Sequence, residues 1–310
     1  MDLGRRVLLL SSASLCSLLW LTSGSPSLQA LHIARPSLRI VAPVSNYKPE
    51  SCGGDSPWEY YRCGDLIGVG GFSNVFRAEH RRTKRQVAVK VMNATIKTRR
   101  IFANEIDALR RIRDRHDVLK LHDAFANRRH MYIVTELLSG ADLFEATAGG
   151  AVSDDDLPST FRMMVDAVAY LHDIGICHLD IKLENFMFTH PAGVPGRTLK
   201  LIDFGLAMPV QDRAKYAPLM FGTEGYFAPE RRYTCTGAQL KASDVWALGI
   251  CLYLMATAGA MPVPTSSRSV GIRVNPAERP TLYNILVGLL ELDTRRRLTC
   301  REALTNDYLR

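Results

Sequence analysis

The sequence predicts an α+β protein of two lobes, a small mainly β lobe with one helix followed by a larger mainly helical lobe. Segments rich in β-branched and aromatic residues predict the strands of the first lobe, at 65–80, 85–92, 118–125 and 131–138. Between them, residues 98–112 carry Phe102, Ile106 and Leu109 at helical spacing, which predicts one amphipathic helix.

Two strong helical patterns follow and predict the core of the second lobe. Residues 153–172 have Ser153 as the expected N-cap with acidic residues in the first turn. The apolar face of this helix is formed by Phe161, Met164, Val165, Val168 and Leu171. Residues 243–258 are apolar nearly all round, which predicts a helix buried at the centre of the lobe.

Composition and charge limit the classes of function. The chain has 310 residues, of which 47% are hydrophobic, enough to bury a substantial core and to exclude disorder for most of the chain. Its net charge of +8 favours anionic partners such as phosphates or acidic surfaces. Much of the excess lies between Arg77 and Arg115, which predicts either a solvated face or contact with an anionic surface. We expect no nucleic-acid partner.

The N-terminus is typical of a secretory signal. Arg5 and Arg6 precede an apolar run that ends at Leu21, and small residues follow near Gly24. We therefore expect a signal peptide at 1–24, a pro-segment or flexible linker at 25–60, and a secreted protein or one in a secretory organelle. An uncleaved signal anchor is the alternative, and no later stretch predicts a membrane span.

A glycine-rich turn interrupts the first strand segment. Glycine lets backbone amides approach an anion that a β-carbon would keep away. The candidate phosphate-binding residues of this turn are Gly68, Val69, Gly70, Gly71 and Ser73. Lys90, on the next predicted strand, is a candidate partner for phosphate oxygens, and Glu105 on the following helix is a candidate partner for its ammonium group.

The loop "CHLDIKLENFMF" concentrates polar residues that suit phosphoryl transfer. Asp180 is the candidate acceptor for the proton of an incoming hydroxyl, and Lys182 is the candidate to stabilise charge on the transferring group. Asn185 and, further on, Asp203 in "LIDFG" offer the hard oxygen atoms that Mg²⁺ prefers.

The order and spacing of these motifs resemble those of eukaryotic protein kinases, from about Tyr61 to Arg310. The resemblance implies an N-lobe at 61–136, a hinge at 136–140 and a C-lobe at 141–310, with ATP and Mg²⁺ as cofactors. It implies that Asp180 is the catalytic base and that Lys90 contacts the α- and β-phosphates.

The same resemblance implies further residues around the nucleotide. Those expected to contact adenine, the hinge or ribose are Val75, Ala88, Thr135, Glu136, Leu138, Asp142 and Met187. Glu230, Arg297 and Asp244 are expected to hold the structure. Lys182 together with Gly222 and Thr223 is typical of serine/threonine kinases, so a protein Ser or Thr hydroxyl is the expected acceptor.

Leu179 departs from the family pattern, which usually has arginine before the catalytic aspartate. That arginine generally needs a phosphorylated residue on the activation segment, here Asp203–Glu230. Between Leu206 and Gly222 this chain has no Ser or Thr and one tyrosine, Tyr216. We therefore expect activity without phosphorylation of the segment. The alternatives are a degraded site, a secreted pseudokinase that acts as a scaffold or allosteric partner, and a small-molecule kinase.

A narrower resemblance combines the signal sequence with "HLDIKLENF". Together these are similar to the secreted rhoptry kinases of apicomplexan parasites. Ser73 is a second departure from the family pattern, since a third glycine usually stands there, and we expect it to stiffen the turn without abolishing nucleotide binding.

Overall fold

A computed structural model describes residues 56–112, 115–266 and 269–310, with the side chains of 263–269 left undescribed. The expected signal peptide at 1–24 and the expected linker as far as residue 55 lie outside the described residues. Among the described residues, no helix is both long and apolar enough to cross a membrane.

The five cysteines of this part of the chain, Cys63, Cys177, Cys235, Cys251 and Cys300, are all free thiols.

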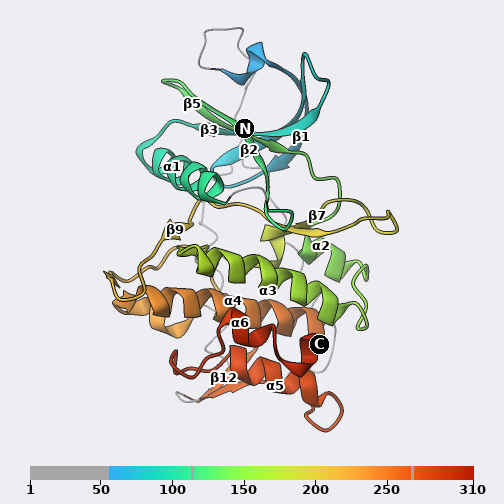
Figure 1. The fold of residues 1–310 in the computed structure, drawn as a ribbon, viewed down its shortest axis with the longest axis vertical. Coiled ribbons are helices and arrows are strands. Elements are labelled where there is room, and N and C mark those ends of the chain that lie inside the picture. The colour runs from blue at the N-terminus through green and yellow to red at the C-terminus, as the bar shows by residue number, and fades with distance from the viewer. Residues whose placement is uncertain (1–55, 113–114, 267–268) are drawn as a thin grey trace, which may run out of the picture. The chain divides into compact units, whose positions relative to one another are not determined.

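The N-lobe is an antiparallel sheet of five strands in the order β1-β2-β3-β5-β4, with one helix against it (Figure 1). The strands are β1 (Tyr61–Val69), β2 (Ser73–His80), β3 (Gln86–Asn93), β4 (Leu121–Ala126) and β5 (His130–Glu136). The helix α1 (Ile96–Arg111) is capped by Thr95, which forms a capping box with Thr98. Segment 65–80 is thus a hairpin of two strands that turns at the glycines.

The packed N-lobe begins before Tyr61. A short 3-10 helix, η1 (Pro57–Glu59), buries Trp58 in a cluster that includes Tyr61, and its ring meets Tyr132 edge-on at 6.1 Å. The end of the expected linker therefore belongs to the folded lobe, because the large apolar surface of tryptophan is stabilised by burial.

The C-lobe is mainly helical. Its helices are α2 (Leu143–Ala148), α3 (Leu157–Asp173), α4 (Gly237–Ala256), α5 (Pro280–Leu289) and α6 (Cys300–Ala303), with 3-10 turns η2 (Leu183–Asn185), η3 (Pro229–Arg232) and η4 (Asp307–Leu309). In Figure 1, α3 and α4 lie across the lobe beneath the sheet. Helix α4 is buried along most of its length, as its uniformly apolar sequence predicts.

Four pairs of short antiparallel strands shape the loops of the C-lobe. They are β6 (Ile176–Cys177) with β9 (Met208–Pro209), β7 (Phe186–Phe188) with β8 (Leu199–Leu201), β10 (Lys215–Tyr216) with β11 (Cys235–Thr236), and β12 (Val263–Ser266) with β13 (Ser269–Gly271). The β7–β8 hairpin and the β6–β9 pair bring residues 178–185 next to residues 202–207.

The expected N-cap of α3 is wrong. The helix begins at Leu157, with Asp156 at the cap position, and the Ser153 hydroxyl instead donates to the Asp156 carboxylate at 2.6 Å within the preceding turn. Pro158, in the first helical turn, explains the start, because its fixed φ suits the beginning of a helix and excludes its interior.

Candidate active site

Lys90 joins the two lobes. Its ammonium group donates to Glu105 on α1 at 2.8 Å and to Asp203 of the C-lobe at 2.9 Å. On β2, β3 and β5, Val75 is the direct partner of Lys90, and Ala88 is the partner of Thr135. Direct antiparallel partners and alternate residues of one strand share a face of the sheet, so these four side chains line the same surface.

Lys90 and its two carboxylate partners, Glu105 and Asp203, stabilise the charged form of Lys90 and of Asp203. Burial alone would lower the pKa of Lys90, but Glu105 and Asp203 reverse this shift and raise it. The Lys90 ammonium holds the pKa of Asp203 at about 2, which outweighs the opposing effect of burial. Asp203 is therefore a carboxylate throughout the physiological pH range and can ligate a cation.

Asp180 lies in a network of donors at the catalytic loop. The Thr223 hydroxyl donates to Oδ1 of Asp180 at 2.9 Å, and Lys182 donates to the Thr223 oxygen at 2.9 Å. The Lys182 ammonium is also 3.3 Å from Oδ2 of Asp180. Loop residues close in sequence and one residue of the activation segment thus converge on a single carboxylate.

Asn185 and Asp203 fit the requirements of a magnesium site. The Asn185 amide nitrogen donates to the Asp180 carbonyl at 2.8 Å, and among the described residues no hydrogen bond uses its Oδ1 oxygen. Asp203 accepts Lys90 through Oδ1, which leaves Oδ2 for a cation. The Ile202 amide donates to the Asn185 carbonyl at 2.8 Å, so the backbone places the two ligands on adjacent segments.

The glycine turn has the geometry of a tight hairpin tip. The Gly70 amide donates to the Ser73 carbonyl at 2.7 Å, and a Cβ on Gly70 would lie 3.2 Å from the Ser73 hydroxyl. Val69 and Phe72 are largely exposed, and the Lys97 ammonium lies 4.0 Å from the centre of the Phe72 ring. The backbone carbonyl of Ser73 therefore closes the turn, and residues Gly68–Gly71 stay partly or fully exposed to solvent.

The hinge is anchored through the side chain of Glu136, a role that the sequence did not reveal. Its carboxylate accepts from the Lys120 amide at 2.7 Å and from the Lys200 ammonium at 2.7 Å. Lys200, on β8 of the C-lobe, is buried. The Thr135 hydroxyl donates to the Glu136 carbonyl at 3.2 Å, which orients a side chain expected to lie beside the adenine.

The remaining nucleotide-site candidates lie just past the hinge. Leu138 is buried, and the Asp142 carboxylate caps α2 by accepting from the Glu145 amide at 2.8 Å. Met187 on β7 pairs with Asp142 through an isolated bridge. Asp142 is thereby held at the start of α2 with its carboxylate already engaged in the cap.

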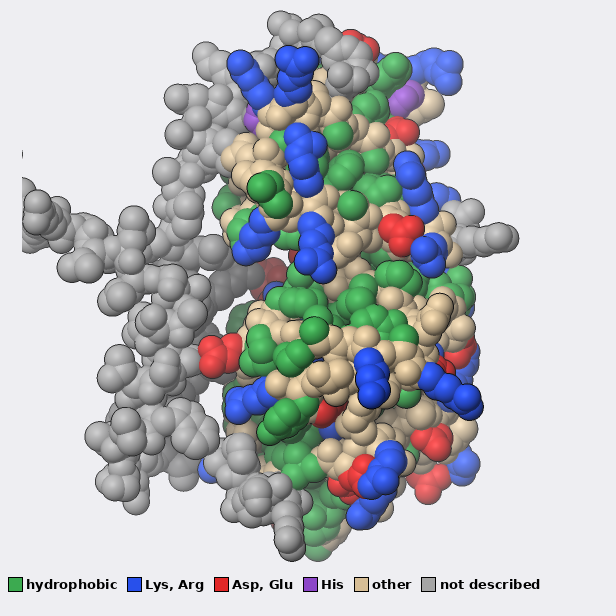
Figure 2. Space-filling model, turned by 90° about the vertical axis from the view of Figure 1, so that its left-hand side faces the viewer, with side chains coloured by type: hydrophobic (Ala, Val, Ile, Leu, Met, Phe, Trp, Pro, Cys, Tyr) green, Lys and Arg blue, Asp and Glu red, His purple; other side chains and the backbone are tan. Residues whose placement is uncertain are grey.

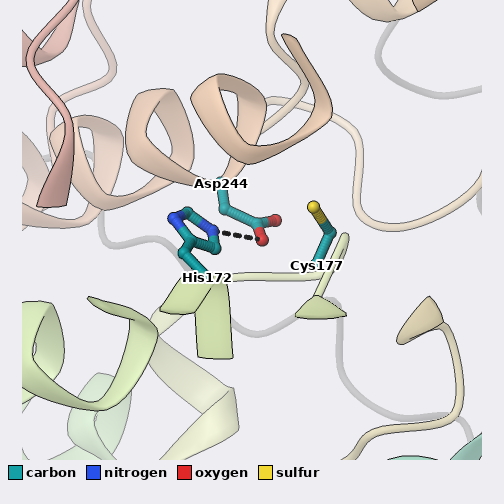
Figure 3. Close-up of side chains that lie close together, drawn as sticks. All are labelled: His172, Cys177 and Asp244. Atoms are coloured by element: carbon teal, nitrogen blue, oxygen red, sulfur yellow. Dashed lines mark hydrogen bonds and ion pairs between the residues drawn. The ribbon is translucent and has the colours of Figure 1, made fainter. Parts of the chain in front are cut away.

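Asp244 braces the catalytic loop from α4. Its two carboxylate oxygens accept from the amides of His178 and Leu179 at 2.8 and 2.9 Å. Figure 3 shows the His172 ring pointing at the same carboxylate, 3.1 Å away, with the thiol of Cys177 beside it. These three side chains resemble a metal-ligand set. However, the carboxylate already receives these donors, and burial raises the pKa of Cys177 well above its usual range. We assign the group to bracing the loop.

A second brace fixes the end of the activation segment. Arg297 donates to both carboxylate oxygens of Glu230 at 2.5 and 3.1 Å, and to the Ala242 carbonyl at 2.8 Å. The Arg297 guanidinium also lies 5.0 Å from the centre of the Trp246 ring. The structure thus pairs Glu230 with Arg297, two of the residues that the resemblance implies hold the structure.

Leu179 packs against the activation segment. It lies in the "Leu179 cluster", whose buried members are Cys177, Leu179, Val210, Cys235 and Leu240, with Met208, Tyr216, Leu219 and Phe221 packed around them. Its φ of 64° is a left-handed conformation that costs about 1–2 kcal/mol in a non-glycine residue. Leu179 is therefore an apolar anchor for the segment at a backbone position that surrounding contacts hold in place.

His178 joins the catalytic loop to Phe204. Their rings meet edge-on at 5.0 Å, and the His178 ring contacts the Ile202 carbonyl at 3.2 Å. The residue before Phe204, Asp203, also has a left-handed φ of 59°. These contacts orient the carboxylates of Asp180 and Asp203 relative to one another.

The fold has a sheet lobe and a helical lobe, and the site brings Lys90, Asn185 and Asp203 together between them. A sequence model of the protein kinase domain matches residues 61–309. The chain belongs to the protein kinase domain family.

Curated relatives agree with this assignment. The chain is 35% identical over 268 residues to human serine/threonine-protein kinase H1, covering 79% of this chain and 60% of that protein. It is 32% identical over 268 residues to CBL-interacting protein kinase 25 of Oryza sativa subsp. japonica, covering 79% and 50%. It is also 33% identical over 268 residues to the calcium/calmodulin-dependent protein kinase type I of Schizosaccharomyces pombe, covering 80% and 78%. The chain spans only part of the length of these relatives.

Proposed function

We propose that this chain is an ATP-dependent serine/threonine protein kinase. Three observations support the proposal: the family match, the names of the relatives, and the convergence of Lys182 and Thr223 on Asp180. The last observation carries it, because a loop that holds a carboxylate beside a lysine and a hydroxyl is equipped to take a proton from an alcohol while charge develops nearby.

In the proposed reaction, an oxygen of the acceptor hydroxyl forms a bond to the γ-phosphorus of ATP as the bond to the β,γ-bridging oxygen breaks, which leaves ADP. Bound Mg²⁺ supplies positive charge that offsets the charge of the phosphates. Lys90, positioned by Glu105, would bind phosphate oxygens, and Asn185 with Asp203 would hold the cation. The hydroxyl proton passes to the Asp180 carboxylate, and Lys182 stabilises the transferring group.

The direct test is transfer of labelled phosphate from ATP to a generic basic protein, followed by identification of the modified amino acids. We expect phosphoserine and phosphothreonine, formed in the presence of Mg²⁺ and lost when it is chelated. No transfer above that of an Asp180→Ala variant, together with ATP-dependent thermal stabilisation of both proteins, would instead identify a pseudokinase. Phosphorylation of small molecules alone would contradict the protein-kinase assignment.

We further propose that activity does not depend on phosphorylation of the activation segment. The apolar Leu179 cluster supports this proposal, because it anchors Val210, Leu219 and Phe221 without any phosphate. Tyr216, the tyrosine between Leu206 and Gly222, packs at the edge of the cluster and accepts a hydrogen bond from the Gln211 amide at 2.9 Å.

Treatment with a phosphatase and the Tyr216→Phe substitution are both expected to leave kcat within about two-fold of the untreated wild type. Phenylalanine keeps the packing of the ring and removes only the hydroxyl that could be phosphorylated. The variant therefore tests whether activity requires a phosphate at this position. A fall of about ten-fold or more in either experiment, with thermal stability unchanged, would contradict phosphate-independent activity.

The basic N-lobe is proposed to contact an anionic surface. On the face shown in Figure 2, Lys and Arg side chains gather over the upper part, which holds the N-lobe. Exposed basic residues lie in the β2–β3 turn and along α1, namely Arg81, Arg82, Lys84, Arg85, Lys97, Arg99, Arg100, Arg110 and Arg111. Their charge favours partners that carry phosphate or carboxylate groups.

Entry into the secretory pathway, and a relation to secreted rhoptry-type kinases, are proposed on the sequence alone. The support is the basic and apolar N-terminus together with the leucine before Asp180. When the full chain is expressed in a secreting host cell, N-terminal sequencing is expected to find the product beginning near Ser25. Leu9→Arg should block this cleavage by interrupting the apolar run. An uncut wild-type N-terminus would contradict the signal peptide.

A further inference from the structure

Arg231 is a buried cation that the mechanism above does not use. It lies in η3, directly after Glu230, and only 4% of its surface is exposed. Its guanidinium group donates to the carbonyl of Leu179 at 3.1 Å and to the carbonyl of Phe221 at 2.6 Å. One side chain thus bridges the residue before the candidate catalytic base and the activation segment.

The backbone of Arg231 is tied to the same segment. Its carbonyl accepts from the Leu219 amide at 3.1 Å. Two aromatic rings flank the guanidinium, with the Phe227 ring centre 4.8 Å and the Phe221 ring centre 5.6 Å from its central carbon. These contacts attach Leu219, Phe221 and Leu179 to one residue.

The guanidinium group of Arg231 remains positively charged although it is buried. Burial lowers the pKa of the guanidinium, and the negative charges of Asp244 and Asp180 oppose that shift. Arginine stays protonated in proteins, so the site holds a permanent positive charge that interacts with the Asp180 carboxylate of the catalytic loop and the Asp244 carboxylate of α4. A buried cation of this kind is tolerated only with hydrogen-bond acceptors, which the two carbonyls provide.

The activation segment and the catalytic loop are in close contact beside Arg231. Gly222, whose φ is 114°, lies so close that an added Cβ would be 3.0 Å from the Leu179 carbonyl and 3.2 Å from Oδ1 of Asp180. The activation segment therefore packs directly against the Leu179 carbonyl, which is the carbonyl that Arg231 binds. A change in this carbonyl's position would move Asp180, the next residue.

We propose that Arg231 is a positioning residue that replaces the phosphate-dependent arginine of other kinases, holding the activation segment against the catalytic loop and Asp180 in its working position. The positive charge absent at Leu179 is supplied from the far end of the segment, and its partners are backbone carbonyls instead of a phosphate. This inference rests on the proposed kinase activity and gives a second physical basis, besides the Leu179 cluster, for a segment that is ordered without modification.

The chemistry requires arginine at this position. The planar fork of the guanidinium reaches two carbonyls at once and stacks on aromatic rings, whereas a lysine ammonium is a single point charge on a flexible stem. Lysine should therefore restore charge without restoring both hydrogen bonds. Methionine keeps a similar apolar stem and removes both.

The experiment compares Arg231→Met, Arg231→Lys and the exposed neighbour Arg232→Met, with kcat and both KM values measured for ATP and a peptide substrate. Loss of hydrogen bonds from a buried charge is expected to lower kcat of Arg231→Met by roughly 10- to 100-fold, with KM for ATP changed by less than about three-fold. Arg231→Lys should fall between Arg231→Met and wild type, and Arg232→Met should match wild type.

Chemical rescue separates positioning from general stability. Millimolar ethylguanidinium is expected to restore part of kcat to Arg231→Ala and to have no effect on Arg232→Ala. Hydrogen exchange should show faster exchange at residues 219–222 in Arg231→Met, with the amides of α4 unchanged. If Arg231→Met does not fold, the lysine variant and the rescue measurement still decide the matter.

A wild-type kcat in Arg231→Met would overturn the proposal, as would an equal fall in Arg231→Lys and Arg231→Met without any rescue. These outcomes differ from failure of the proposed function. If the chain were not a kinase, the wild type itself would transfer no more phosphate than Asp180→Ala, and no Arg231 variant would change that rate.

Discussion

Asp180→Asn is expected to lower kcat by roughly 10²- to 10⁴-fold while nucleotide binding persists. Asparagine keeps the size of the side chain and its hydrogen bond from the Thr223 hydroxyl, which is 2.9 Å long in the wild type. It cannot accept a proton from an acceptor alcohol. The loss corresponds to removal of the general base, about 3–5 kcal/mol of transition-state stabilisation.

The measurement is steady-state phosphate transfer, with the ATP-induced rise in melting temperature as a separate readout of binding. Asp155→Asn is the matched control, because Asp155 is an exposed aspartate in the turn before α3. It should retain wild-type kcat. If Asp180→Asn retained activity within about two-fold, the carboxylate would not be the base.

Lys90→Met is expected to have the second large effect, acting on both catalysis and stability. Removing the donor that binds the phosphates should lower kcat/KM by roughly 10²-fold or more. It also leaves Glu105, whose side chain is 2% exposed, without its partner. Breaking a buried pair on one side costs about 3–5 kcal/mol of unfolding free energy.

The double variant Lys90→Met with Glu105→Gln separates these two effects. It should recover much of the melting temperature, because the buried Glu105 position no longer carries an unpaired charge, and it should recover none of the activity. Glu105→Gln alone should lose less activity than Lys90→Met, since Lys90 keeps its contact with Asp203 at 2.9 Å. Recovery of phosphate transfer in the double variant would contradict the role assigned to Lys90.

The pH dependence of stability gives an independent check on Lys90→Met. Burial raises the pKa of Glu105, and Lys90 opposes that shift in the wild type. A carboxyl whose pKa is raised by folding stabilises the protein below its unfolded pKa, and this stabilisation is lost as pH rises through the folded pKa. Unfolding of Lys90→Met by denaturant should therefore show stability rising as pH falls through that range, and the double variant should not.

The catalytic motifs could be predicted because each is short and local in the sequence. Asp180, Lys182 and Asn185 lie in one loop, and strand alternation places Ala88 and Lys90 on one face without knowledge of the rest of the fold. The uniformly apolar sequence of α4 likewise determines its burial, whatever surrounds it.

Contacts between distant segments could not be predicted in this way. The sequence identifies Leu179 as an unusual residue, but only the folded chain brings the guanidinium of Arg231 onto its carbonyl. The pairing of Glu136 with Lys200 is hidden for the same reason, since a charged residue on a strand is most often solvated. The helix α3 begins later in the chain than the predicted N-cap Ser153 implies, because the position of Pro158 outweighs the capping preference of Ser153.

The Glu136–Lys200 pair also determines where the two lobes can turn. It joins the end of β5 to β8 at 2.7 Å, at the first residue of the expected hinge. If the N-lobe rotates relative to the C-lobe while this ion pair stays intact, the axis of rotation must pass close to the pair. The displacement of each N-lobe segment then grows with its distance from the pair. Thr135, next to Glu136, would then hardly move, while segments farther from the pair, such as the tip formed by Gly68–Gly71, would move more. In the proposed kinase, nucleotide exchange is therefore expected to proceed by outward movement of that tip, while the backbone around Thr135 stays in place.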